Sequence, residues 1–116
     1  MWGAKKGNRD TGIVAAPQDP YFRTLFVRLE KAIVFPKDLA LDLRAGKPTA
    51  EMVLRADGTI GRTEIAISSG LTGFDRELLR AIGTLGRLPA PPATLLEGRS
   101  EIRVRIEWAF DPGILR

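Results

Sequence analysis

The feature that most constrains the fold is an Asp-Gly pair, Asp57-Gly58, which separates two segments rich in apolar residues. Aspartate and glycine tolerate the positive φ angles of a tight hairpin turn, so residues 46–70 predict two antiparallel strands. In the first strand, alternate residues should face the core, and these are Ala50, Met52, Leu54 and Ala56.

The second strand needs an irregularity if its apolar residues are to share one face. A two-residue loop at the Asp-Gly pair would pair Met52 with Thr63 and would turn Ile60 away from the core. Gly61 follows, and a glycine inside a strand often marks a β-bulge. One extra residue there would return Ile60 to the face of Ile65, so we expect a bulge at Gly61.

Two helices and a third strand complete the predicted elements. Residues 21–34 have apolar residues at helical spacing after a start signal at Asp19-Pro20. Residues 72–83 have the same spacing, with Thr72 or Asp75 as the expected cap. A proline-rich connection, residues 87–95, crosses back from the second helix to the sheet. In residues 100–110, which follow, charged and apolar residues alternate as in a strand with one buried face.

The predicted fold class is α+β with the order α-β-β-α-β. Connection lengths and handedness favour a three-stranded antiparallel sheet of order second, first, last, with both helices packed on one face. The last strand would then be a free edge, with its outer N–H and C=O groups unpaired. Such an edge can accept an extended peptide by main-chain hydrogen bonds that do not depend on the peptide's sequence.

The composition indicates one small domain and excludes most catalytic chemistry. With 116 residues, we expect a flexible leader at residues 1–20 and a single domain at residues 21–113. The chain has no histidine and no cysteine, so no thiol nucleophile, no thiolate metal site and no histidine base are available. We therefore expect no catalytic residue, no metal site and no cofactor. The net charge of +4 favours acidic partners without locating a nucleic-acid footprint.

Several short motifs occur in an order that a known family shares. The first is an aromatic-proline pair after the first helix, and the second is a glycine that leads into a strand ending at Asp-Gly. A Ser-Ser-Gly sequence then ends the next strand. An apolar-Asp pair in the second helix and a proline cluster complete the order. The matching residues are Phe35-Pro36, Gly46, Asp57-Gly58, Ser68-Ser69-Gly70, Phe74-Asp75 and Pro89 to Pro92. From about Tyr21 to Phe110 the chain resembles the C-terminal domain of TonB- and TolA-type proteins. Pro48 departs from the pattern, because the family usually has a β-branched residue there.

The resemblance implies a periplasmic binding domain that is tethered to the inner membrane in a full-length protein. Such a domain couples an inner-membrane complex to an outer-membrane receptor or partner by strand addition. Family members carry a membrane anchor and a long linker, so the sequence looks like an excised or free-standing domain.

Arg103 and Arg105 would contact an acidic or polar partner segment, although a solvated face explains them equally well. Trp108 could anchor the partner, although a core position is favoured for it. Carried over by position, the partner-binding strand comprises Ile102, Arg103, Val104, Arg105, Ile106, Glu107 and Trp108.

Three alternatives remain open from the sequence. The same fold could serve as a structural adapter of a secretion or motility assembly. A basic nucleic-acid-binding module is disfavoured, because the predicted charged face lacks the aromatic residues on which bases stack. An open edge could also form a homodimer by strand exchange.

Overall fold

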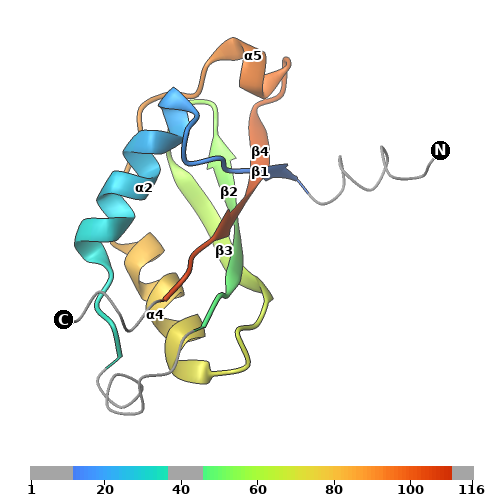
Figure 1. Cartoon of the computed structure of the whole chain (residues 1–116). Helices are drawn as coiled ribbons and strands as arrows, with labels where there is room; N and C mark the ends of the chain where they lie inside the picture. Colours follow the sequence, from blue (N-terminus) through green and yellow to red (C-terminus); the bar gives the residue numbers. More distant parts are fainter. Residues whose placement is uncertain (1–11, 37–45, 111–116) are drawn as a thin grey trace.

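The computed structural model describes residues 12–36 and 46–110, which form one mixed sheet with helices on one of its faces (Figure 1). The sheet contains four strands in the order β1-β4-β2-β3. Helices α2 and α4 lie together on one side of this sheet, and the short helix α5 precedes β4. In chain order the elements are β1 (Ile13–Val14), α2 (Pro20–Ala32), β2 (Thr49–Arg55), β3 (Ile60–Ile67), α4 (Thr72–Gly83), α5 (Ala93–Leu96) and β4 (Glu101–Glu107).

The predicted three-stranded antiparallel sheet is wrong in its strand count and at one edge. The three predicted strands do have the order β4-β2-β3, and both β2 pairings are antiparallel. A fourth strand, β1, adds to the outer side of β4 in parallel. It comes from the segment expected to be a leader, where two apolar residues are too few to show a strand period. Residues 1–11 and the predicted domain end at residue 113 lie outside the described residues.

The hairpin of β2 and β3 forms as expected, with a loop one residue longer. Arg55 N–H donates to the carbonyl of Thr59 at 2.9 Å, so residues 56–58 form the loop and Gly58 takes a φ of +92°. The predicted bulge is present: Leu54 pairs with Ile60, whereas Met52 pairs with Thr63. The extra β3 residue lies at positions 61–62, which keeps Ile60 packed against the core.

The two main helices follow their sequence signals closely. The Asp19 carboxylate accepts the N–H of Tyr21 at 2.8 Å and caps α2, with Pro20 at the first helical position. Helix α4 begins at Thr72, but its N-cap is Leu71, so neither Thr72 nor Asp75 caps it as predicted. The Asp75 carboxylate instead accepts the N–H of Ser69 at 2.9 Å and ties the end of β3 to the helix.

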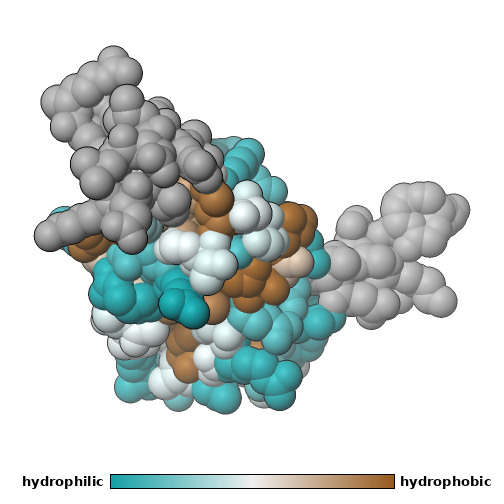
Figure 2. All heavy atoms as spheres, turned by 90° about the horizontal axis from the view of Figure 1, so that it is seen from below, coloured by the Kyte–Doolittle hydropathy of each residue, from teal (hydrophilic) through white to brown (hydrophobic). Residues whose placement is uncertain are grey.

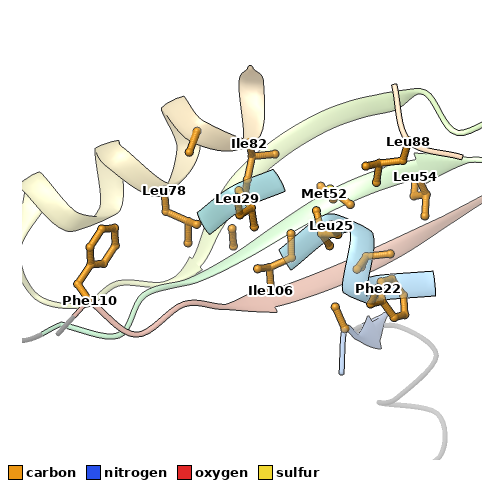
Figure 3. Packing of buried hydrophobic residues seen from close by; sticks show 14 of the residues in the cluster. Phe22, Leu25, Leu29, Met52, Leu54, Leu78, Ile82, Leu88, Ile106 and Phe110 are labelled. Atoms are coloured by element: carbon orange, nitrogen blue, oxygen red, sulfur yellow. The ribbon is translucent and has the colours of Figure 1, made fainter. Parts of the chain in front are cut away.

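The core lies between the helices and the sheet (Figure 3). It is formed by α2 and α4 on one side and by the even-numbered residues of β2 and β4 on the other. The fully enclosed side chains of this core include Leu25, Leu29, Met52, Leu54, Leu78, Ile82, Val104 and Ile106. On the surface, Figure 2 shows that apolar residues form separate patches among hydrophilic ones on the molecule's lower face.

The proline-rich crossing, residues 87–95, covers one end of this core. Leu88 is 3% exposed, and its N–H donates to the carbonyl of Gly58 at 2.9 Å. The Tyr21 hydroxyl donates to the carbonyl of Pro89 at 2.7 Å, which ties α2 to the crossing. The crossing is not extended throughout, because its last residues turn into α5.

Candidate partner-binding edge

The hydrogen-bonding direction alternates along β4 and decides which residues can accept another strand. Trp108 N–H donates to Pro48 at 3.2 Å, and Ala56 N–H donates to Ser100 at 2.8 Å. In an antiparallel pair, successive residues direct their backbone groups to opposite sides. Even-numbered β4 residues therefore bond to β2, and odd-numbered residues direct their N–H and C=O groups to the outer edge.

Strand β1 occupies only the middle of that outer edge. Ile13 pairs with Val104 and Val14 with Arg105, and Ala15 N–H donates to the carbonyl of Arg105 at 2.8 Å. The prediction of a fully free last strand is thus wrong at these positions. Among the residues that the structure describes, none pairs with the outward backbone groups of Glu101 or Glu107, so the edge is open at both ends of β4.

Gly12 sets where β1 leaves the edge of β4. It has a φ of +85°, a left-handed conformation that glycine adopts at little cost. A Cβ atom at this position would lie 2.5 Å from the carbonyl oxygen of Arg103, so a larger residue does not fit. The close approach of the backbone to β4 at this position therefore requires glycine.

An open cleft of about 550 Å³ lies between the start of β4, β1 and α5. Ile13, Leu95 and Ile102 give it an apolar part, and these three side chains are at least partly buried. Four charged residues also line the cleft, and they are Glu97, Arg99, Glu101 and Arg103. The cleft thus adjoins the open upstream edge of β4.

The seven predicted site residues divide between the two faces of the sheet. Ile102, Val104 and Ile106 point into the core and are at most 4% exposed, so they cannot contact a partner directly. Their backbone groups also face β2 rather than the outer edge. The outward-facing positions are Arg103, Arg105 and Glu107.

The charged side chains of β4 already have partners on the uncovered face of the sheet. Glu51, whose side chain is 13% exposed, lies 3.7 Å from Arg103 and 3.4 Å from Arg105. Glu107 lies 3.5 Å from Lys47. The two arginines are therefore neither simply solvated nor unpaired. A partner carboxylate would have to compete with Glu51 for them.

Trp108 lies just beyond β4 and stacks on Phe26 of α2. The ring centroids are 6.1 Å apart with an interplanar angle of 12°. Both rings are partly buried against the core, so the core position favoured for Trp108 is correct in part. An aromatic surface thus remains beside the downstream edge at Glu107.

The acidic residues Asp57 and Asp75 have structural roles. Hydrogen bonds from the N–H and hydroxyl of Thr59 hold the pKa of Asp57 below its usual value. Burial raises the pKa of Asp75, but hydrogen bonds from Ser68 and Ser69 outweigh this and leave it lowered. Across residues 12–36 and 46–110, no three acidic side chains gather as a metal site would require. No helix in the same ranges has the length and apolar character needed to cross a membrane.

A contact between α2 and α4 was missed from the sequence. The Glu77 carboxylate accepts the N–H of Val34 at 2.6 Å and pairs with Arg80 at 2.6 Å. Arg80 in turn donates to the carbonyl of Ala32 at 2.7 Å. Burial raises the pKa of Glu77, but the bonds from Arg80 and Val34 outweigh it, so the pKa is lowered. Nothing in the local sequence spacing signals this contact, because its partners are more than 40 residues apart.

The missed element, β1, left a weak sequence signal. Ile13 and Val14 are adjacent β-branched residues in the segment that was expected to be a leader. Ala15 is 4% exposed and Ile13 is partly buried, whereas Val14 is 58% exposed. The alternation is that of a strand with one buried face, but two residues cannot establish a period.

The fold is similar to several solved structures. The TonB C-terminal domain of Helicobacter pylori is 14% identical, with a TM-score of 0.67 over 96% of this chain and 94% of that one. The HasB C-terminal domain is 25% identical, with a TM-score of 0.54 over 83% of this chain and 72% of that one. TolAIII bound to a peptide derived from the N-terminus of TolB is 19% identical, with a TM-score of 0.59 over 78% and 74%.

The sequence itself matches a family model. No curated protein matches the chain. The model described as TonB C terminal matches residues 18–108, which include every described element except β1. That family is non-catalytic. With the fold and most of the chain matched, this protein belongs to the TonB C-terminal domain family.

Proposed function

We propose that this chain is the periplasmic binding domain of a TonB- or TolA-like protein and that it grips an extended segment of an outer-membrane receptor or envelope partner along β4. In this proposal a full-length protein is tethered to the inner membrane and couples a complex there to the partner. The family as a whole binds outer-membrane partners and is typically periplasmic. The TolAIII structure, solved with a TolB peptide, supports a peptide ligand for this fold.

The pairing of β1 with β4 is the observation that carries the proposal. In the native chain the outer edge of β4 already carries a parallel strand, whose Ile13 is partly buried against the core. The native occupant is only two residues long, against seven residues in β4. A longer segment in the same place would pair with the groups of Glu101 and Glu107 that β1 leaves open.

The partner would therefore replace β1 rather than add to it. β1 contributes few hydrogen bonds, so its release costs little compared with those that a longer strand gains. An incoming segment in the same direction would place apolar residues where Ile13 and Ala15 lie. The proposed site is the strand and its aromatic neighbour. Arg103, Arg105, Glu107 and Trp108 would contact the segment, whereas Ile102, Val104 and Ile106 anchor the strand in the core.

The backbone supplies most of the affinity in this proposal. Arg103 and Arg105 would contact acidic or polar residues of the segment, in exchange for part of their pairing with Glu51. The Trp108 and Phe26 rings would contact an apolar residue at the downstream end.

Amide exchange can test the proposal with synthetic peptides from periplasmic segments of outer-membrane receptors of the same organism. On binding, the Glu107 amide should become protected, since it faces outward. The Val104 and Ile106 amides face β2 and should already be protected. Protection that develops elsewhere, with no change at Glu107, would contradict the proposed edge.

Proline scanning gives a matched pair of variants. Glu107→Pro removes an outward N–H and spares the β2 ladder, so it should fold and lose peptide binding. Glu107→Gln removes only the charge and should bind nearly as the parent does. Val104→Pro is a poorer test, because it removes an inward hydrogen bond and threatens the fold. Unchanged peptide binding by a folded Glu107→Pro protein would contradict the proposal.

The adapter role would use the same edge and differs only in energy coupling. Co-purification with an inner-membrane proton-channel complex would support coupling, and its absence from envelope extracts would support the adapter. Nucleic-acid binding gains no support, because Arg55, Arg103 and Arg105 are each paired with glutamates on the uncovered face.

A further inference from the structure

The opposite end of the sheet, β3, carries a second open edge that the proposed function does not use. Its start is covered: Leu88 N–H donates to the carbonyl of Gly58, and Arg87 forms a bridge with Thr59. From residue 61 to residue 67, no strand of the described chain lies on the outer side. This part of β3 is available for another strand.

The backbone direction on β3 follows from its pairing with β2. Arg55 N–H bonds to Thr59, and Glu51 lies opposite Glu64, so odd-numbered β2 residues bond to β3. Glu64 therefore directs its backbone groups inward to β2. Thr63 and Ile65 direct theirs outward, where they have no strand to pair with among the described residues.

The uncovered face of the sheet shows an imbalance in how its charges are paired. On β2 and β4, every charged side chain of this face has an ion-pair partner: Glu51 with Arg103 and Arg105, Arg55 with Glu101, and Glu107 with Lys47. Arg62 and Glu64 of β3 are both exposed and line the same shallow pocket as Glu51. Within residues 12–36 and 46–110 neither of them has an ion-pair partner.

We propose that β3 is a self-association edge, where two copies of this chain pair antiparallel about a twofold axis at Thr63. This register places Arg62 of each copy opposite Glu64 of the other, which forms two equivalent ion pairs. Both pairs occupy non-hydrogen-bonded positions, where opposing Cα atoms are only about 4.5 Å apart. The outward backbone groups of Thr63 and Ile65 are satisfied in the same step.

The occupant is a second copy because the edge is complementary to itself. Moving the twofold axis by one residue, to Glu64, shifts the register by two residues; it would set Glu64 opposite Glu64 and leave Arg62 opposite Ala66. The overlap spans residues 61–65, and an interface of this size is weak. The resulting sheet keeps β1 and β4 at each of its two ends, away from the contact between the copies, so self-association and partner binding are compatible.

Charge exchange tests both the surface and the register. Sedimentation of the full chain over a roughly hundredfold range of concentration should show a reversible monomer–dimer equilibrium. Arg62→Glu and Glu64→Arg each set like charges against one another and should weaken the dimer at least about tenfold. The double variant, R62E with E64R, restores opposite charges and should recover most of the lost affinity.

A variant that changes the backbone tests the dimer independently of the charge reversals. Thr63→Pro removes an outward N–H without touching the β2 ladder, so it should abolish the dimer while far-UV circular dichroism stays unchanged. A chain that stays monomeric at every concentration overturns the proposal. So does a dimer that ignores the single reversals, or a double variant that fails to recover. Loss of peptide binding at β4 is measured separately with Glu107→Pro, so the two proposals can fail independently.

Discussion

Gly58 is the residue on which the hairpin most depends. Its φ of +92° disfavours any side chain, and a Cβ atom there would lie 1.9 Å from the carbonyl oxygen of Leu88. That carbonyl belongs to backbone, which cannot rotate away as a flexible side chain would. Gly58→Ala should therefore lower the free energy of unfolding by more than about 1 kcal/mol, as measured by urea denaturation.

Gly83 provides the matched control for that substitution. It ends α4, has an ordinary φ, and a Cβ atom there would meet nothing within 4 Å. Gly83→Ala should leave the protein as stable or raise its free energy of unfolding by about 0.5–1 kcal/mol. Equal destabilisation by both variants would show that the contact with Leu88 is not the cause.

Glu77 joins helix α4 to the end of helix α2. Its carboxylate accepts from Val34 and pairs with Arg80, which holds Ala32 at the end of α2. Glu77→Gln keeps the shape and removes the charge. Hydrogen bonds to charged groups contribute more than neutral ones, so we expect a loss of about 1–2 kcal/mol in chemical denaturation. Glu30→Gln, an exposed position on α2, should change stability by less than about 0.5 kcal/mol.

Among the elements, β1 should be the first to open. Its two-residue pairing can separate from β4 without disturbing the antiparallel ladder of β2 and β4. The Ala15 amide, bonded to Arg105, should therefore exchange much faster than the Ile106 amide. Gly12→Ala introduces an atom 2.5 Å from the carbonyl of Arg103 and should speed exchange at Ala15 further.

The same variant connects β1 to partner binding. If β1 and the partner segment compete for β4, Gly12→Ala should raise peptide affinity while it leaves most of the free energy of unfolding intact. Lower affinity with a loosened β1 would mean that β1 assists binding instead of blocking it. Val14→Ser, which changes an exposed side chain, is the matched control and should alter neither property greatly.

The accuracy of the sequence predictions varied with the length of each element. The hairpin, its bulge, both long helices and β4 each have enough residues to show a period or a turn signal. β1 and α5, with two and four residues, are too short for either. Their positions depend on tertiary contacts such as that of Ala15 with Arg105, which no local pattern encodes.

At the scale of the whole molecule, the contrast between predictable long elements and unpredictable short ones determined how much of the site could be predicted. The alternation of β4 correctly separated its buried residues from its charged ones. The edge itself was misjudged, because an edge is defined by what lies beside it, and β1 was missing from the predicted sheet. Pairing of Arg103 and Arg105 with Glu51 likewise depends on strand register across 52 or more positions.

Stability as a function of pH should report the combined effect of three carboxylates. Asp57, Asp75 and Glu77 each have a pKa below the usual value, so below about pH 5 the unfolded chain binds more protons than the folded one. The stability they contribute is present above their unfolded pKa values and is lost as the pH falls through the folded ones. With no histidine in the chain, the urea midpoint should change little between about pH 8 and pH 5 and fall below that. Glu77→Gln should be less stable than the parent at neutral pH, and the two midpoints should converge once Glu77 is protonated. A constant gap between them down to about pH 2 would show that the charge of Glu77 is not what joins α2 to α4.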